Sequence, residues 1–153
     1  MRRKDREKDQ EFAKQIFADC EYATFATVDS NNIPYAVPIS VVIEGDYLYF
    51  HAAVEGRKLS NLKSNNYVCM SCVSYTKLLP YSFTTEYKSA VAFGKAYIVL
   101  DESEKIKALK LITLKYAAEN IASFDEEIAS AIDRTVVIRV EIDEITGKAN
   151  TSS

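Results

Sequence analysis

The sequence predicts a mainly β protein of the α+β class, with about six antiparallel strands forming a small barrel or sheet and with flanking helices. Short segments rich in β-branched and aromatic residues recur along the chain, and turn residues separate several of them. One amphipathic helical stretch precedes these segments, and a longer helical stretch interrupts them before the last one. The predicted strands are residues 21–28, 33–44, 47–50, 67–73, 89–100 and 135–142.

Residues 1–10 are predicted to be an exposed lead-in, because they contain five cations, three anions and a single apolar side chain. A helix is expected from about Asp9. Its apolar side chains recur at helical spacing and should pack in the core. They are Phe12, Ala13, Ile16, Phe17 and Cys20.

Proline and glycine mark irregular strands. The strand at 33–44 contains Pro34 and Pro38, which have no N–H to donate, so an edge position with partly unpaired backbone is expected. Gly94 predicts a bulge in the strand at 89–100. The aromatic connection at 74–88 has no clean period, and Pro80 should break any regular element there. Such a connection is expected to cover a core or to meet another surface.

Two helices are predicted before the final strand. Asp101 followed by Glu104 is the pattern of an N-capped helix start, and Ser123 followed by Glu126 repeats it. The longer helix should bury one side. That side consists of Ile106, Leu109, Ile112 and Tyr116.

The composition is that of one ordinary globular domain spanning 1–153. A net charge of −3 gives no reason to expect a nucleic-acid partner. No apolar run approaches the roughly 20 residues that a membrane helix needs, and the charged N-terminus is unlike a signal peptide, so no membrane association and a cytoplasmic location are expected. Cys69 and Cys72 have metal-site spacing but no second ligand pair, so we expect structural thiols and no metal.

The stretch 47–72 carries the strongest functional signal. It contains His51, the only histidine, at the end of a predicted strand. A small-residue step and Gly56 follow, and then Arg57 and Lys58 begin a short helix at 57–64. Unpaired N–H groups at a helix start, next to two cations, favour a phosphate. A solvated surface pair of cations is the alternative interpretation.

This stretch, FHAAVEGRKLSNLKSN followed by YVCMSC, resembles the phosphate-binding segment of flavoproteins related to pyridoxamine 5'-phosphate oxidase, and most of all their nitroimidazole-reductase (Nim-type) branch. The runs EYKS and FGKA at 86–96, and ITGK at 145–148, resemble further stretches of that family. The similarity covers roughly 23–148. It implies a six-stranded split β-barrel that forms a homodimer and holds FMN in grooves where the subunits meet.

The resemblance also implies residue roles. Arg57 and Lys58 would hold the phosphate, the strand at 37–41 would lie along the isoalloxazine ring, and Ser89 would give a polar contact. His51 would hold the cofactor, contact the substrate or donate a proton. The implied cofactor-binding residues are Ile39, Ser40, Val41, His51, Ala52, Arg57, Lys58 and Ser89.

Two functions follow from such a pocket. One is an FMN-dependent oxidoreductase acting on a small molecule, a nitroaromatic compound being one substrate class. The other is a non-enzymatic sensor or store of flavin or haem, with His51 as an axial ligand in the haem case. Oxidation of pyridoxamine phosphate is not expected, because the chain has no Trp and stops soon after Gly147 and Lys148, where larger relatives continue into a ligand-clamping segment.

Overall fold

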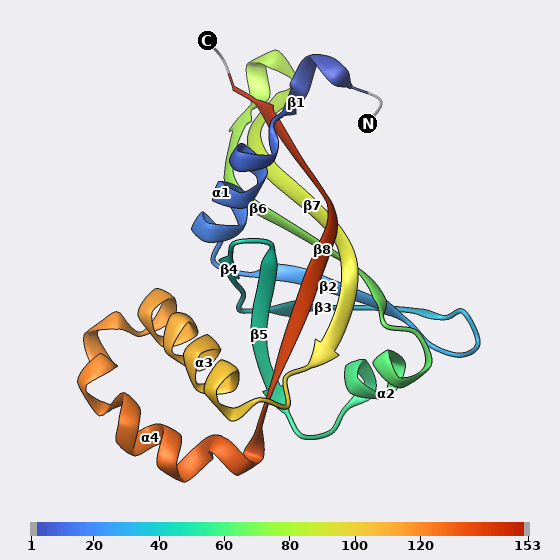
Figure 1. The fold of residues 1–153 in the computed structure, drawn as a ribbon. Helices are drawn as coiled ribbons and strands as arrows, with labels where there is room; N and C mark the ends of the chain where they lie inside the picture. The colour runs from blue at the N-terminus through green and yellow to red at the C-terminus, as the bar shows by residue number, and fades with distance from the viewer. Residues whose placement is uncertain (1–2, 152–153) are drawn as a thin grey trace.

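The computed structural model describes residues 3–151, so the first two residues of the expected lead-in lie outside the described part. One sheet of eight strands dominates it, with strand order β3-β2-β6-β7-β8-β5-β4 and β1 added beside β8 (Figure 1). The strands are β1 Glu7–Lys8, β2 Ala23–Val28, β3 Pro34–Ile39, β4 Val42–Glu44, β5 Tyr47–Ala53, β6 Tyr67–Leu79, β7 Thr84–Ile98 and β8 Thr135–Asn150.

Four α-helices and four short 3-10 helices flank this sheet. In Figure 1, α3 and α4 lie together on one side of the sheet, and α2 lies on the other side near its lower end. The α-helices are α1 Gln10–Asp19, α2 Arg57–Ser64, α3 Glu102–Tyr116 and α4 Phe124–Ala131. The 3-10 helices are η1 Lys4–Arg6, η2 Pro80–Ser82, η3 Ala118–Ser123 and η4 Ile132–Arg134.

The sheet curls but does not close, which confirms the predicted split barrel. All strand pairs are antiparallel. Within the described chain β3 pairs only with β2, and β4 pairs only with β5, so these two strands end the strand order, while the short β1 pairs only with β8. The proline-containing β3 therefore has the edge position that its missing N–H groups require.

Two of the eight strands were not expected. The predicted strand at 33–44 breaks at residues 40 and 41, because the chain passes there from one edge of the sheet to the other. β1 is a two-residue strand whose Glu7 and Lys8 pair with Lys148 and Gly147, and nothing local in a run of charges predicts that pairing.

The connection at 74–88 is regular, contrary to expectation. β6 and β7 continue through it as a hairpin, and Leu78 is paired with Thr85 near its end. Pro80 begins the 3-10 turn η2, where its missing N–H costs nothing, rather than interrupting a strand. The register shifts between Phe93 and Gly94, which confirms the bulge, and a Cβ at Gly94 would overlap the carbonyl oxygen of Glu141.

The barrel interior forms the main core. Its largest buried side chains come from four strands and from α1, whose apolar stripe packs inward as predicted. They include Phe17, Phe25, Leu48, Phe50, Met70 and Ile138. Gly147 allows α1 to pack closely, since a Cβ there would lie 2.8 Å from the Phe12 ring.

A second core lies where α3 and α4 cover the outer face of β4 and β5. Leu109 and Ile112 are buried in it as predicted, whereas Tyr116 stays 37% exposed. The Asp101 carboxylate caps α3 by accepting the Glu104 N–H at 2.7 Å. Ser123 precedes α4 as predicted but makes no capping bond with its side chain.

None of the helices within 3–151 is both long and apolar enough to cross a membrane. The three cysteines are free thiols, with Cys20 and Cys72 buried and Cys69 partly buried. No cluster of metal-ligating side chains occurs among the described residues.

Candidate cofactor site

The start of α2 leaves its backbone donors open. β5 ends at Ala53, and a three-residue loop leads to Gly56, the N-cap residue, whose φ of 142° is in a region that favours glycine. Gly56 provides no capping side chain, so the first N–H groups of α2 have no side-chain partner there. A Cβ at this position would meet open space, so an anion can approach the helix start.

Two cations stand at this helix start with few partners. Arg57 is about half exposed, its Nη2 lies 3.8 Å from the Asp29 carboxylate, and its guanidinium lies 4.9 Å from the Tyr35 ring centroid. Lys58 is partly exposed and has no ion pair with any residue of the described chain. The turn between β2 and β3 therefore steers Arg57 but does not saturate its donors.

A buried polar contact fixes α2 against the barrel. The Asn61 side-chain amide is 3% exposed and donates to the Thr27 hydroxyl at 2.8 Å. Leu59 packs into the main core one residue after the cations. Together these contacts hold the helix start in place, and sequence reasoning missed the role of Asn61 because Thr27 is distant in the chain.

His51 and Ala52 precede the helix start on opposite faces of β5. Ala52 is 7% exposed and faces the core opposite Val136. His51 lies opposite Val137 on the outer face and is exposed to solvent. His51, Ala52 and the two cations thus lie near the same end of β5, with His51 and Ala52 on opposite faces of the strand.

Residues 37–41 are the strand expected along the flavin ring, and the backbone N–H and C=O of the last residue, Val41, already have hydrogen-bond partners. Ile39 packs against the core, Ser40 is exposed between β3 and β4, and Val41 is fully buried. The Val41 N–H donates to the Tyr116 hydroxyl at 2.9 Å. The Val41 carbonyl accepts from that hydroxyl at 2.9 Å and from Lys115 Nζ at 2.8 Å.

Sequence reasoning missed Lys115 and Tyr116, although Tyr116 was noted on the helix stripe. Because they already bond Val41, the Val41 backbone is not open to a planar ring. Burial raises the pKa of the Tyr116 hydroxyl, so it stays a neutral donor.

Ser89 lies apart from the other predicted residues. Ser89 is on β7, where it pairs with Val73 of β6 and Lys148 of β8. It lines a cavity of about 580 Å³ between β2, β6 and β7. Seven residues separate it from Ala96, whose N–H bonds Asn66 beside α2. At about 3.3 Å per residue this separation is roughly 23 Å. Asn66 follows the C-terminal end of α2, so Ser89 lies far along β7 from that end of the helix.

The outer face of β6 and β7 is rich in aromatic side chains. Tyr67, Phe93 and Tyr97 are 37–48% exposed there. At the hairpin tip Leu78, Tyr81 and Phe83 are 77–99% exposed, which is unusual for side chains of this size. This aromatic face extends from the barrel to the tip.

Residues 9–149 match the pyridoxamine 5'-phosphate oxidase family. The chain belongs to this family. A search of curated proteins gave no match.

Solved structures agree on the fold. A candidate 5-nitroimidazole antibiotic resistance protein from Bacteroides thetaiotaomicron is 27% identical, with a TM-score of 0.77 over 93% of this chain and 84% of that one. The flavocytochrome Anf3 from Azotobacter vinelandii is 24% identical, with a TM-score of 0.72 over 94% and 68% of the two chains. An FAD- and haem-binding protein from Mycobacterium smegmatis is 19% identical, with a TM-score of 0.77 over 94% and 72%.

Proposed function

We propose that this protein binds FMN between two copies of the chain and is an oxidoreductase that reduces a small acceptor, with nitroaromatic compounds as the substrate class. The observation that carries the proposal is the open start of α2, where Gly56 gives no cap and Arg57 and Lys58 stand together. Membership of the pyridoxamine 5'-phosphate oxidase family supports a flavin as the ligand. The likeness to the Bacteroides protein supports a nitro compound as the acceptor.

The residues at the helix start fit a phosphate. Arg57 presents a planar fork of donors, Lys58 a compact charge, and the α2 N–H groups complete the set. The ion pair between Asp29 and Arg57 is long, at 3.8 Å, so the Arg57 guanidinium can exchange it for a bond to a ligand. FMN fits such a site better than riboflavin, which has no phosphate.

Flavin supplies the redox chemistry when it is bound. The chain's own residues position the cofactor and exclude water. His51 stands on the outer face of β5, six residues before the phosphate cations, so an extended strand end places its ring nearer the reacting end of the ligand. We assign His51 the role of proton donor to the reduced acceptor, since imidazole gains and loses protons near neutral pH.

A second copy of the chain completes the site in this proposal. Ser89 is roughly 23 Å along β7 from the strand position next to α2, so the Ser89 of a partner subunit is the one that reaches the ligand. The aromatic face of β6 and β7 is the surface that the second copy would cover. A stable dimer needs more than about 1,000 Å² of such buried surface. Sedimentation that finds a monomer at micromolar concentration with cofactor bound would contradict this arrangement.

The phosphate site is tested with a pair of ligands. Replacing Arg57 and Lys58 together by Ala removes charge-assisted bonds of about 1.5–3 kcal/mol each before solvent losses, so FMN affinity should fall more than a hundredfold. Riboflavin affinity should barely change. The control is Lys63→Ala with Lys110→Ala, which removes the same charge at the far end of α2 and on α3. Equal losses for FMN and riboflavin would place the phosphate elsewhere.

The visible spectrum separates the enzyme from a haem-binding alternative. That alternative draws support from the fold shared with the haem-binding protein of Mycobacterium smegmatis. Protein purified without added cofactor should have the paired bands of a flavin. A single intense Soret band would favour the haem protein, and a protein that takes up neither group would contradict both functions.

The proton-donor role is tested with His51→Gln. The variant should retain flavin but reoxidise about 10²–10⁴-fold more slowly with a nitroaromatic acceptor, and its pH profile near neutrality should flatten. Stopped-flow measurements at full flavin occupancy compare it with the wild type. An unchanged rate and profile would leave His51 a purely structural part of the pocket.

A further inference from the structure

Two buried thiols, those of Cys20 and Cys72, lie where the C-terminal end of α1 meets the sheet. Cys20 is the C-cap residue of α1 and is 1% exposed, and Cys72 in β6 is 5% exposed. Cys72 pairs with Ala23 of β2, and Ala23 is only three residues after Cys20 in the chain. Both side chains belong to the same buried cluster, and each thiol shifts the pKa of the other, so the two sulfur atoms are neighbours where the end of α1 meets β6.

A lysine ammonium lies against the same pair. Lys115 Nζ donates to the Phe17 carbonyl oxygen at 3.0 Å, and Cys20 Sγ donates to that same oxygen at 3.3 Å. Since both groups bond one acceptor atom, the ammonium and the thiol are close neighbours. Asp19 precedes Cys20 in the chain, and its charge acts against a thiolate.

The two thiols differ in pKa: that of Cys20 is lowered and that of Cys72 is raised. The neighbouring Cys72 thiol lowers the pKa of Cys20, burial raises it, and the charge of Lys115 lowers it further. The interaction with Cys20, followed by burial, raises the pKa of Cys72. Nucleophilic cysteines have this arrangement, in which a cation and a neighbouring thiol stabilise one thiolate.

Small molecules have a short path to both sulfur atoms. Cys72 lines the cavity of about 580 Å³ beside β2 and β6. Cys20 and Lys115 line a second cavity of about 610 Å³ at the end of α1. Glu21 and Tyr22 are exposed and form part of the wall of both cavities, so the two cavities adjoin each other at the surface.

We propose that Cys20 and Cys72 are a redox-active dithiol that hydrogen peroxide converts to an intramolecular disulfide. The Cys20 thiolate attacks one peroxide oxygen, the O–O bond breaks, and the departing oxygen takes a proton and leaves as water. Cys20 is then a sulfenic acid. The Cys72 sulfur attacks the Cys20 sulfur, the S–O bond breaks, and the Cys72 proton leaves with the hydroxide as a second water. Two thiols are thereby oxidised by two electrons, and one peroxide is reduced to two waters.

Cys69 provides a matched control on the same strand. It faces the outside of β6, opposite Ala26 and Phe93, and burial raises its pKa. It has no cation beside it in the described structure. Its thiol should therefore stay reduced while the other two react.

The test is peptide mapping of full-length protein after treatment with one equivalent of hydrogen peroxide. We expect two of three thiols to disappear, one peptide pair joining Cys20 to Cys72, and full recovery of the thiols with a dithiol reductant. Cys69→Ser should behave as the wild type, whereas Cys20→Ser and Cys72→Ser should form no cross-link. Three free thiols after treatment, or a cross-link through Cys69, would overturn the proposal.

The role of Lys115 has a separate readout. Lys115→Met should slow disulfide formation about tenfold at neutral pH and move its pH profile upward, because the thiolate loses its neighbouring cation. The profile distinguishes a charge effect from damage to the fold, since a loosened structure would expose Cys69 and the other thiols together and speed their alkylation. An unaltered rate and profile would remove Lys115 from the dithiol site. Cys72 shares its cavity with Ser89, and Cys20 shares the other cavity with Ser40, so both experiments are run on cofactor-free protein, and bound FMN should slow the oxidation.

Discussion

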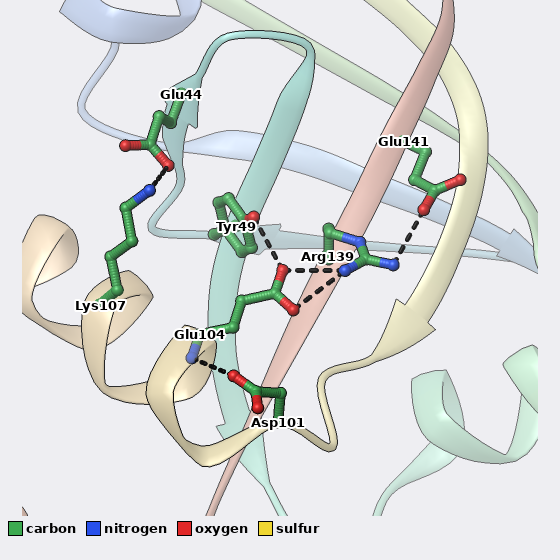
Figure 2. A network of polar contacts seen from close by, with 7 residues as sticks. All are labelled: Glu44, Tyr49, Asp101, Glu104, Lys107, Arg139 and Glu141. Atoms are coloured by element: carbon green, nitrogen blue, oxygen red, sulfur yellow. Dashed lines mark hydrogen bonds and ion pairs between the residues drawn. The ribbon is translucent and has the colours of Figure 1, made fainter.

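Arg139 and Arg57 are the same residue type in two contrasting surroundings. Arg139 on β8 donates through Nη1 to both oxygens of the Glu104 carboxylate at 2.9 and 3.0 Å, and through Nη2 to Glu141 at 2.9 Å (Figure 2). Tyr47 and Tyr97 place ring centroids 5.5 and 5.9 Å from its guanidinium. Arg57, by contrast, has one ion pair at 3.8 Å and one ring.

The difference separates structural cations from cations available to a ligand. Glu104 accepts from Arg139 and from the Tyr49 hydroxyl at 2.9 Å, so its carboxylate joins α3 to β5 and β8 (Figure 2). Even there the buried Arg139 Nε has no partner within the described structure. The Arg139 cluster joins elements of the fold, whereas Arg57 has one ion pair and one ring contact within the described chain.

The largest expected effect is on stability. Arg139→Ala leaves the Glu104 carboxylate, which is 26% exposed, without its main counter-charge, so we expect a loss of about 2–3 kcal/mol in the free energy of unfolding. Arg57→Ala should change it by less than about 0.5 kcal/mol, because its ion pair is long and exposed. Urea denaturation of the two variants measures both. Similar losses would show that Arg57 is also structural.

For FMN affinity, the expected order of the two variants is the opposite of that for stability. Arg57→Ala should lower FMN affinity about tenfold or more by removing one charge-assisted contact. Arg139→Ala should leave FMN affinity unchanged as long as the protein is folded, since the Arg139 cluster lies under α3 rather than at α2. Fluorescence titration with FMN at a temperature where both variants are folded gives the two constants. A larger loss for the Arg139 variant would reverse the assignment.

Tyr49 offers a pH test of the Arg139 cluster. Burial first, and then the hydrogen bond to Glu104, raises the pKa of its hydroxyl. A raised pKa means that the folded form keeps the proton longer, so the contribution of Tyr49 is complete below about pH 10 and is lost as the pH rises above that value. Tyr49→Phe should cost about 1 kcal/mol at pH 7, and the gap to the wild type should shrink above pH 10. A constant gap over pH 7–11 would exclude this linkage.

The smallest effect compares the two helix starts. Asp101→Ala removes the cap of α3 and should lower stability by about 1 kcal/mol or less without changing FMN affinity. Gly56→Ala forces a Cβ into a φ of 142° and should lower stability by a similar amount. Unlike the first variant, it should also weaken FMN binding. Thermal unfolding and FMN titration of both variants check the pair.

Features that depend on neighbours in sequence were predictable. The bounds of α2, the Asp101 cap and the Gly94 bulge each have a local signature, and the structure contains all three. The Arg139 cluster was not predictable, because it joins β5, α3 and β8, and the relevant positions look like ordinary strand and surface residues. The same reason hid the bonds from Lys115 and Tyr116 to Val41.

Of the residues proposed for the site, one group lies close together and one residue lies apart. His51, Ala52 and the two cations lie within one continuous segment, so strand and helix geometry alone brings them together. Ser89 depends on how far β7 extends, and the hairpin at 74–88 concealed that length because Pro80 gave no sign that it stood at a turn. The spacing of Ser89 from α2 is therefore visible only in three dimensions.

β8 is the strand made last, yet it lies between β7 and β5. It pairs with β7 from Asn150 to Ile138 and with β5 from Glu141 to Thr135. During synthesis on the ribosome, both neighbouring strands therefore wait with unpaired edges until residues 135–150 have emerged. Open edges of this kind attach readily to other chains. The nascent protein is thus open to association with other chains in the interval just before β8 is released.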